Sequence, residues 1–187
     1  MVASSLEKLE EQFDVDIHWR SFELRPAGSP PLPPEYRKRI ESSRPALERR
    51  AREQYGLDIN AGLFGIDSRP ALIAEKYAGS QGKGEAFHKA VMKAYWQEAR
   101  AIDDQLVLKE IAEDVGLDGG NFETELTNPA YDAAVSADID LAREYGLDGV
   151  PALVFADRYL VVGAQPYDVL KQVVEKVQKE EHERCAN

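Results

Sequence analysis

Apolar residues recur at helical spacing over most of this sequence. Leu6, Leu9 and Phe13 predict a short amphipathic helix at the start of the chain, and Ser4 and Glu7 have the spacing of a capping box. The middle of the sequence predicts further helices over residues 35–55, 69–78, 85–99, 104–115 and 129–145. Three of these ranges are followed by glycine, leucine and aspartate. A glycine just past the last turn favours a left-handed helix stop.

Strand-like patterns occupy two parts of the chain. Residues 15–24 begin with apolar and polar positions in alternation, which predicts a half-buried strand at a sheet edge. Residues 25–34 are rich in proline and read as a loop. Residues 152–156 and 159–162 are apolar runs separated by Asp157 and Arg158, which predicts a tight hairpin. A lone strand and a distant hairpin need a common sheet, so the pattern predicts an α/β fold.

The end of the chain predicts one more helix. Apolar residues line one face of it, with Val169, Leu170, Val173 and Val174 at helical spacing. From about residue 179 the sequence becomes almost wholly charged, and we expect a frayed tail there.

Composition and charge narrow the function. The chain has 187 residues, 43% hydrophobic and 30% charged, which fits one globular domain or a domain with a large insertion. Its apolar runs are too short to span a bilayer, so we expect no membrane partner. The net charge of −11 argues against nucleic-acid binding. The single cysteine, Cys185, excludes an intrachain disulfide framework, a cysteine-rich zinc site and a Cys-x-x-Cys centre within these residues.

Few side chains suggest chemistry of their own. His182 and Cys185 could share a helix face, and the histidine would then lower the thiol pKa. Their place in a polar terminal segment favours an ordinary exposed cysteine instead. His88 reads as a helix-surface or half-buried histidine. Seven basic residues lie between positions 37 and 52, interleaved with glutamates, which favours a solvated helix face over an anion or acidic-partner site.

Gly149, Val150 and Pro151 stand directly before the first strand of the hairpin. One interpretation is a loop with a cis bond before Pro151, which would leave the backbone of Val150 open to an extended peptide or a thiol ligand. The other is a proline that marks the start of a strand. Spacing alone favours the second interpretation, because cis is a small minority of bonds before proline.

Several motifs together carry a resemblance to a known family. They are Phe22-Glu-Leu-Arg-Pro26, Ser68-Arg69-Pro-Ala71, Ala86-Phe-His-Lys-Ala90, Ala101-Ile-Asp-Asp104, Gly146-Leu-Asp-Gly-Val-Pro-Ala152 and Gly163-Ala-Gln-Pro166. Through essentially its whole length the chain resembles the DsbA-like thioredoxin-fold family, and specifically its FrnE-like branch. That branch is similar to 2-hydroxychromene-2-carboxylate isomerases and kappa-class glutathione transferases.

The resemblance implies a thioredoxin-like α/β fold with a large helical insertion. Residues 1–30 and 128–187 would form the two parts of the thioredoxin-like domain, and residues 31–127 the insertion. Gly149, Val150 and Pro151 would be the cis-proline loop that binds substrate. The family's first strand and its Cys-x-x-Cys motif would lie before Met1, so we expect no catalytic residue in this chain. A start assigned too late explains this most simply, and a strand from a second chain is the alternative.

The resemblance also implies a thiol–disulfide oxidoreductase in the complete form. Its substrate would be a peptide or small-thiol disulfide, with glutathione as one candidate. We expect these residues to be inactive in dithiol exchange, because Cys185 cannot be both the nucleophile and the resolving thiol. A glutathione-dependent isomerase or transferase and a non-catalytic interaction module remain alternatives. We further expect no cofactor, no metal and a cytoplasmic location, which is usual in the FrnE-like branch. A homodimer is also expected, because homodimers occur in relatives and an unpaired hydrophobic strand favours self-association.

Overall fold

The computed structural model describes residues 2–60 and 62–185, except for the side chain of Cys185. It divides into two compact units. Residues 1–19 and 147–187 form one, called the terminal unit below, and residues 20–146 form the other, called the helical unit. None of the helices in these described residues is long and apolar enough to cross a membrane.

The terminal unit is built from a hairpin and two helices. Helix α1 spans Val2–Gln12 and helix α8 spans Tyr167–Cys185. Strands β1 (Ala152–Phe155) and β2 (Tyr159–Val162) pair antiparallel. The predicted hairpin is therefore confirmed, although its turn takes one residue more than the sequence indicated. That residue is Ala156, which adopts a positive φ of 49°, and Asp157 follows with a φ of 54°. Left-handed backbone at such positions matches the twist of paired strands.

One face of the hairpin forms the core of the terminal unit. Leu9 on α1 and Leu170 on α8 are 1% and 0% exposed, and Leu153, Phe155 and Val161 pack against them. Successive strand residues point to opposite faces, so the neighbouring positions of the hairpin face away from this core.

Residues 15–24 do not form the predicted strand. The segment carries no strand assignment, and β1 and β2 are the paired strands in the described part of the chain. Val15 and Ile17 nevertheless pack against the core of the terminal unit. The alternation therefore indicated correctly that Val15 and Ile17 face a core. A strand also needs a neighbouring backbone that completes its hydrogen bonds.

Two predicted helix ends are wrong. Helix α1 already includes residue 2, so Ser4 lies inside the helix instead of capping it. Helix α8 continues through the charged segment to residue 185. Lys176 and Lys179 lie within 4.0 and 3.9 Å of Glu180 and Glu183, one turn further along the helix. Pairs at this spacing stabilise a helix, which accounts for the regular structure where we expected fraying.

The helical unit holds six helices in the described residues. They are α2 (Pro34–Tyr55), α3 (Arg69–Ser80), α4 (Gly84–Trp96), α5 (Gln105–Asp114), α6 (Gly119–Leu126) and α7 (Pro129–Glu144). The sequence predicted five of them within a few residues at each end. It missed α6, which is short and begins with two glycines, both poor helix formers. The side chain of Asp118 caps it by accepting a hydrogen bond from the amide of Gly120 at 2.9 Å.

The three predicted glycine stops are confirmed. Gly56, Gly116 and Gly146 have φ values of 64°, 83° and 67°. After the second stop, Leu117 donates its backbone N–H back to Ala112 at 2.9 Å, and its side chain is 8% exposed. The leucine thus folds onto the helix that it follows, as the motif requires.

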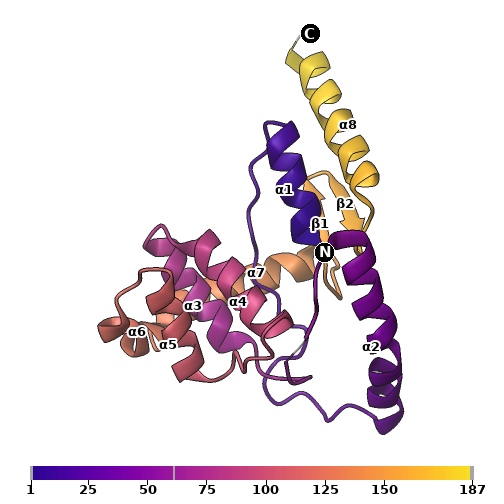
Figure 1. The fold of residues 1–187 in the computed structure, drawn as a ribbon. Helices are drawn as coiled ribbons and strands as arrows, with labels where there is room; N and C mark the ends of the chain where they lie inside the picture. The colour runs from indigo at the N-terminus through magenta and orange to yellow at the C-terminus, as the bar shows by residue number, and fades with distance from the viewer. Residues whose placement is uncertain (1, 61, 186–187) are drawn as a thin grey trace. The chain divides into compact units, whose positions relative to one another are not determined.

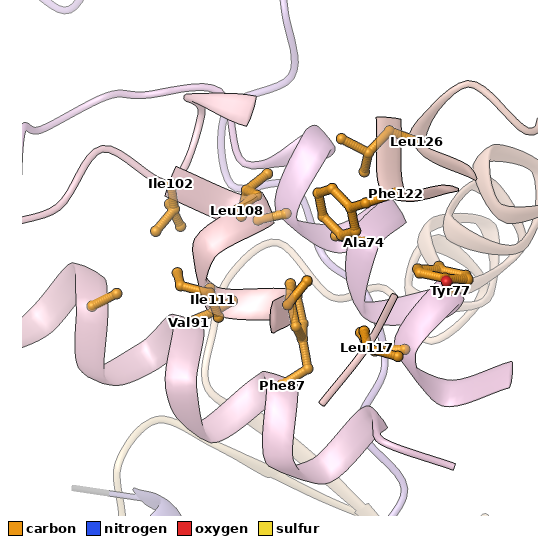
Figure 2. Packing of buried hydrophobic residues seen from close by; sticks show 14 residues of the cluster. Ala74, Tyr77, Phe87, Val91, Ile102, Leu108, Ile111, Leu117, Phe122 and Leu126 are labelled. Carbon is orange, nitrogen blue, oxygen red and sulfur yellow. The ribbon is translucent and has the colours of Figure 1, made fainter. Parts of the chain in front are cut away.

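The core of the helical unit joins α3, α4, α5 and α6 (Figure 2). Phe87, Leu108 and Phe122 are fully buried. Helix α3 contributes Ala71, Ala74 and Ala78 along one stripe, and these small residues leave room for the larger side chains. The aromatic rings of Tyr77 and Phe122 meet in a tilted arrangement with centroids 6.2 Å apart.

Candidate functional site

The loop of Gly149, Val150 and Pro151 lies in the terminal unit, directly before β1 (Figure 1). The peptide bond between Val150 and Pro151 is cis. Val150 is 57% exposed, whereas Gly149 and Pro151 are half-buried. Thus the middle residue of the loop is the most exposed of the three.

The motif of residues 163–166, which follows β2, is hydrogen-bonded to this loop. The backbone N–H of Gly163 donates to the carbonyl of Pro151 at 2.8 Å. Gly163 has a φ of 80°, and Gln165 donates its side-chain amide to the carbonyl of Val162 at 2.9 Å. The turn that contains Gly163 and Gln165 is therefore hydrogen-bonded, and it extends the β1–β2 pairing by one residue into the loop.

The surroundings of the loop are apolar. Leu160 and Val162 on β2 are 46% and 55% exposed, on the face of the hairpin that points away from α1 and α8. Val154 and Ala152 on β1 pair with them and share that face. An extended ligand along the loop would therefore meet apolar side chains.

The loop offers hydrogen-bonding groups but no acid, base or nucleophile. Gly149, Val150 and Pro151 have no titratable side chain. Within the described residues no hydrogen bond occupies the backbone N–H or carbonyl of Val150. These groups can pair with the main chain of an extended peptide, much as a neighbouring strand would. The arrangement can bind and orient a ligand.

The other side chains that the sequence singled out lie on other elements. His88 belongs to the helical unit, where its Nδ1 lies 3.2 Å from a carboxylate oxygen of Glu75. His182 lies on α8, with Nδ1 2.9 Å from the carbonyl of Gln178. The side chain of Cys185 falls outside the described residues. Among the residues that the structure does describe, no cluster of three or more histidine, cysteine or acidic side chains could hold a metal ion.

A network of charges around one buried carboxylate in the helical unit was missed by the sequence analysis. Asp138 on α7 is 6% exposed and binds Lys76 on α3, Arg20 at 3.2 Å and the backbone N–H of Ser21 at 2.8 Å. One signal was present in the sequence. The buried positions of α7 are Val135, Asp138 and Ala142, so the carboxylate stands on the core-facing stripe of the helix.

Arg69 forms a separate group of polar contacts in the same unit. It lies 3.2 Å from a carboxylate oxygen of Glu23 and donates to Asp132 at 2.7 Å and to Ser136 at 2.8 Å. The hydrogen bond from Arg69 lowers the pKa of Asp132. Two motifs that are far apart in the sequence, those containing Glu23 and Arg69, therefore meet in the fold. Their contact fixes the segment that leads into the helical unit.

Comparison with known proteins gives the fold its context. Residues 1–175 match the family model of the DSBA-like thioredoxin domain. The chain is 29% identical over 171 residues to YwbO of Bacillus subtilis, a match that covers 89% of this chain and 84% of YwbO.

Two solved structures also resemble it. A probable DsbA oxidoreductase from Streptomyces coelicolor matches with a TM-score of 0.83 and 26% identity, over 96% of this chain and 84% of that one. A 2-hydroxychromene-2-carboxylate isomerase matches with a TM-score of 0.76 and 21% identity, over 99% and 91% of the two chains. The fold is thioredoxin-like, of the DsbA type with its helical insertion, and the chain belongs to the DSBA-like thioredoxin domain family.

Proposed function

We propose that this chain takes part in thiol–disulfide exchange of the DsbA type, and that the loop of Gly149, Val150 and Pro151 binds the substrate. The substrate would be an extended peptide disulfide or a small-thiol disulfide such as oxidised glutathione. One observation carries the proposal. Val150 is 57% exposed, and its main-chain N–H and carbonyl have no hydrogen-bond partner in the described residues, beside the apolar face of the hairpin.

These residues would hold a disulfide without completing a dithiol cycle. Exchange needs a thiolate that attacks one sulfur and a second thiol that resolves the mixed disulfide. The sequence contains one cysteine, Cys185. The proposal is therefore a binding role for this segment, with no dithiol turnover supplied by its own residues.

A glutathione-dependent isomerase or transferase is the second candidate. Such chemistry uses one bound glutathione thiol, which an isomerase regenerates and a transferase joins to its acceptor, and it needs no pair of protein cysteines. The fold is shared with an isomerase, and the loop offers backbone groups suited to the peptide bonds of glutathione. The two candidates differ in the ligand that the loop should prefer, namely a disulfide in the first case and the reduced thiol in the second.

Titration with ligands separates these candidates. We would follow the backbone amide signals of the protein by NMR while adding oxidised glutathione, reduced glutathione or a disulfide-linked peptide. Shifts confined to the loop and to Gly163, saturating with the disulfides, support the exchange role. Saturation with the reduced thiol alone supports the isomerase role. No saturable shift with any of the three overturns binding at this loop.

A matched pair of variants locates the binding. Val150→Asp places a charge on the proposed contact, and we expect it to weaken binding about tenfold or more, because like-charge or unpaired contacts are costly in a ligand site. Leu106→Asp makes the same change at another exposed residue, 66% exposed on α5, and should leave binding unchanged. Equal loss in both variants would contradict a site at Val150.

An insulin-reduction assay tests the chemical part of the proposal. We expect no catalysed reduction by these residues, because the chain has one cysteine. Reduction that disappears in Cys185→Ser would show that Cys185 performs the chemistry, and it would overturn the assignment of a purely binding role.

A further inference from the structure

Pro151 is held to the end of the second strand by one backbone hydrogen bond. Its carbonyl accepts the N–H of Gly163 at 2.8 Å. Facing residues of an antiparallel pair ordinarily exchange two such bonds, but proline has no backbone N–H and can only accept. The position of the loop relative to β2 therefore depends on where the chain holds the N–H of Gly163.

The register of the hairpin shows which way the neighbouring backbone groups point. Facing residues of an antiparallel pair alternate between hydrogen-bonded and non-hydrogen-bonded positions. Because Gly163 bonds to Pro151, the adjacent pair of Val162 with Ala152 is of the second kind. The carbonyl of Val162 thus points to the outer edge of β2, away from β1. In the described residues the sheet has two strands, so no further strand pairs with this edge.

Gln165 takes the place of a neighbouring strand at this edge. Its side-chain amide donates to the carbonyl of Val162 at 2.9 Å. The side chain can reach back because the backbone turns at Gly163, which has a φ of 80°. A backbone carbonyl needs a partner, and this bond supplies one at the last residue of β2. Val162 directly precedes Gly163, so the bond also restrains the N–H that holds Pro151.

The other end of the turn is anchored in the core of the terminal unit. The carbonyl of Pro166 accepts the N–H of Val169 at 3.1 Å at the start of α8. Leu170, in the first turn of this helix, is 0% exposed and belongs to the core that Leu153 packs against. Gln165 therefore joins two anchored elements, the start of α8 and the end of β2.

We propose that Gln165 is a positioning residue for the ligand loop. Its hydrogen bond to Val162 holds the N–H of Gly163 against the carbonyl of Pro151, and that contact orients Val150. The inference rests on the proposed function, because it assigns the residue that keeps the binding loop in place before a ligand arrives. Groups that are held in position in advance lose less freedom on binding, which favours affinity. Gln165 acts through its neighbours and needs no contact with the ligand.

Two substitutions remove the donor in different ways. Gln165→Leu keeps the approximate size of the side chain but has no polar group. Gln165→Glu keeps its shape and places a carboxylate oxygen, which only accepts, against the carbonyl of Val162. A hydrogen-bonding role predicts that both substitutions loosen the loop, whereas a packing role predicts that Gln165→Glu is tolerated. Gln172→Leu removes an exposed glutamine of α8 in the same unit and is the matched control.

Hydrogen exchange at the backbone amide of Gly163 tests the inference without any ligand. We expect this amide to exchange about threefold to tenfold faster in both Gln165 variants and at the wild-type rate in Gln172→Leu, since one ordinary hydrogen bond is lost. The amide of Val161, which faces Leu153 in the next hydrogen-bonded pair, should keep its rate. An equal rise at Val161 would indicate general destabilisation and overturn the inference. Unchanged exchange at Gly163, or a change in Gln165→Leu alone, also overturns it.

Ligand titration connects the position of the loop with binding. For oxidised glutathione or the disulfide-linked peptide, whichever the wild type binds, both Gln165 variants should raise the dissociation constant about threefold to tenfold. Gln172→Leu should leave it unchanged. Faster exchange at Gly163 with wild-type affinity overturns the positioning role and leaves the binding site standing. A wild type that binds none of these ligands overturns the proposed function, and the exchange rates at Gly163 then decide alone whether Gln165 holds the loop.

Discussion

The carboxylate of Asp138 accepts a hydrogen bond from the backbone N–H of Ser21 at 2.8 Å, across 117 positions of sequence. The same side chain binds Lys76 on α3 and Arg20. One buried residue thus connects α7, α3 and the start of the helical unit. A carboxylate that is 6% exposed needs such partners, because a buried charge without them is strongly destabilising.

We expect Asp138→Ala to lower the free energy of unfolding by about 3 kcal/mol, because it leaves Lys76 without its partner and the amide of Ser21 without an acceptor. Asp140→Ala is the matched control on the same helix. Asp140 is exposed and pairs with Arg143 at the surface, so its loss should cost no more than about 0.5 kcal/mol. Chemical denaturation measures both. Equal effects would mean that the buried network contributes no more than a surface pair.

Asp138 also gives folding a dependence on pH. Burial alone raises the pKa of this carboxyl, but the hydrogen bonds from Lys76 and the amide of Ser21 outweigh it, so the pKa lies below its ordinary value. A group with a lowered pKa in the folded state stabilises that state above its unfolded pKa, about 3.9 for aspartate. Its contribution is lost as pH falls below about 4.

The measurement is the stability of the wild type and Asp138→Asn between neutral and acid pH. We expect the wild type to lose more stability than the variant below about pH 4, because the variant has no carboxyl to protonate at this site. Parallel curves for the two proteins in the acid range would show that Asp138 does not carry this dependence.

The sequence could predict those features of the fold that depend on neighbouring residues alone, such as helices and their ends. Five of the six helices of the helical unit followed from apolar spacing, and the stops at Gly56, Gly116 and Gly146 followed from backbone sterics. The segment of residues 15–24 shows the limit. Its alternation correctly indicated that Val15 and Ile17 face a core, but pairing depends on another backbone, which no local pattern contains.

In the candidate site, too, the sequence could predict the local features but not the contacts between distant segments. The sequence could single out Gly149, Val150 and Pro151, because proline and glycine restrict the backbone in known ways. It could not show that Gly163 closes the loop through Pro151, since that contact depends on the register of the hairpin. The sequence could have singled out Asp138 as a charge on the apolar stripe of a helix. It could not have identified the partners of Asp138, which come from distant segments.

Phe87 tests the core of the helical unit. The side chain is 0% exposed and packs within the cluster of Figure 2. Phe87→Ala should destabilise this unit by about 3–5 kcal/mol, through lost burial and the cavity that remains. Met92→Ala on the same helix is the control, since Met92 is 44% exposed and should cost about 1 kcal/mol or less. Thermal unfolding compares them, and a small effect of Phe87→Ala would require the neighbouring side chains to refill the space.

Two glycines of the helical unit should respond oppositely to the same substitution. Gly56 ends α2 with a φ of 64°, which alanine adopts only with strain, so Gly56→Ala should cost about 1 kcal/mol. Gly79 lies inside α3, and a Cβ there would meet no atom within 4 Å. Gly79→Ala should stabilise the protein by roughly 0.5–1 kcal/mol, because glycine is the poorer helix former.

Denaturant unfolding of both variants measures the difference in sign. The change in chemistry is one methyl group in each case, and neither position is crowded, so packing cannot account for opposite results. Backbone conformation is then the remaining cause, acting through the left-handed stop at Gly56 and the regular helix at Gly79. Stabilisation by Gly56→Ala would show that α2 does not end in the left-handed conformation in solution.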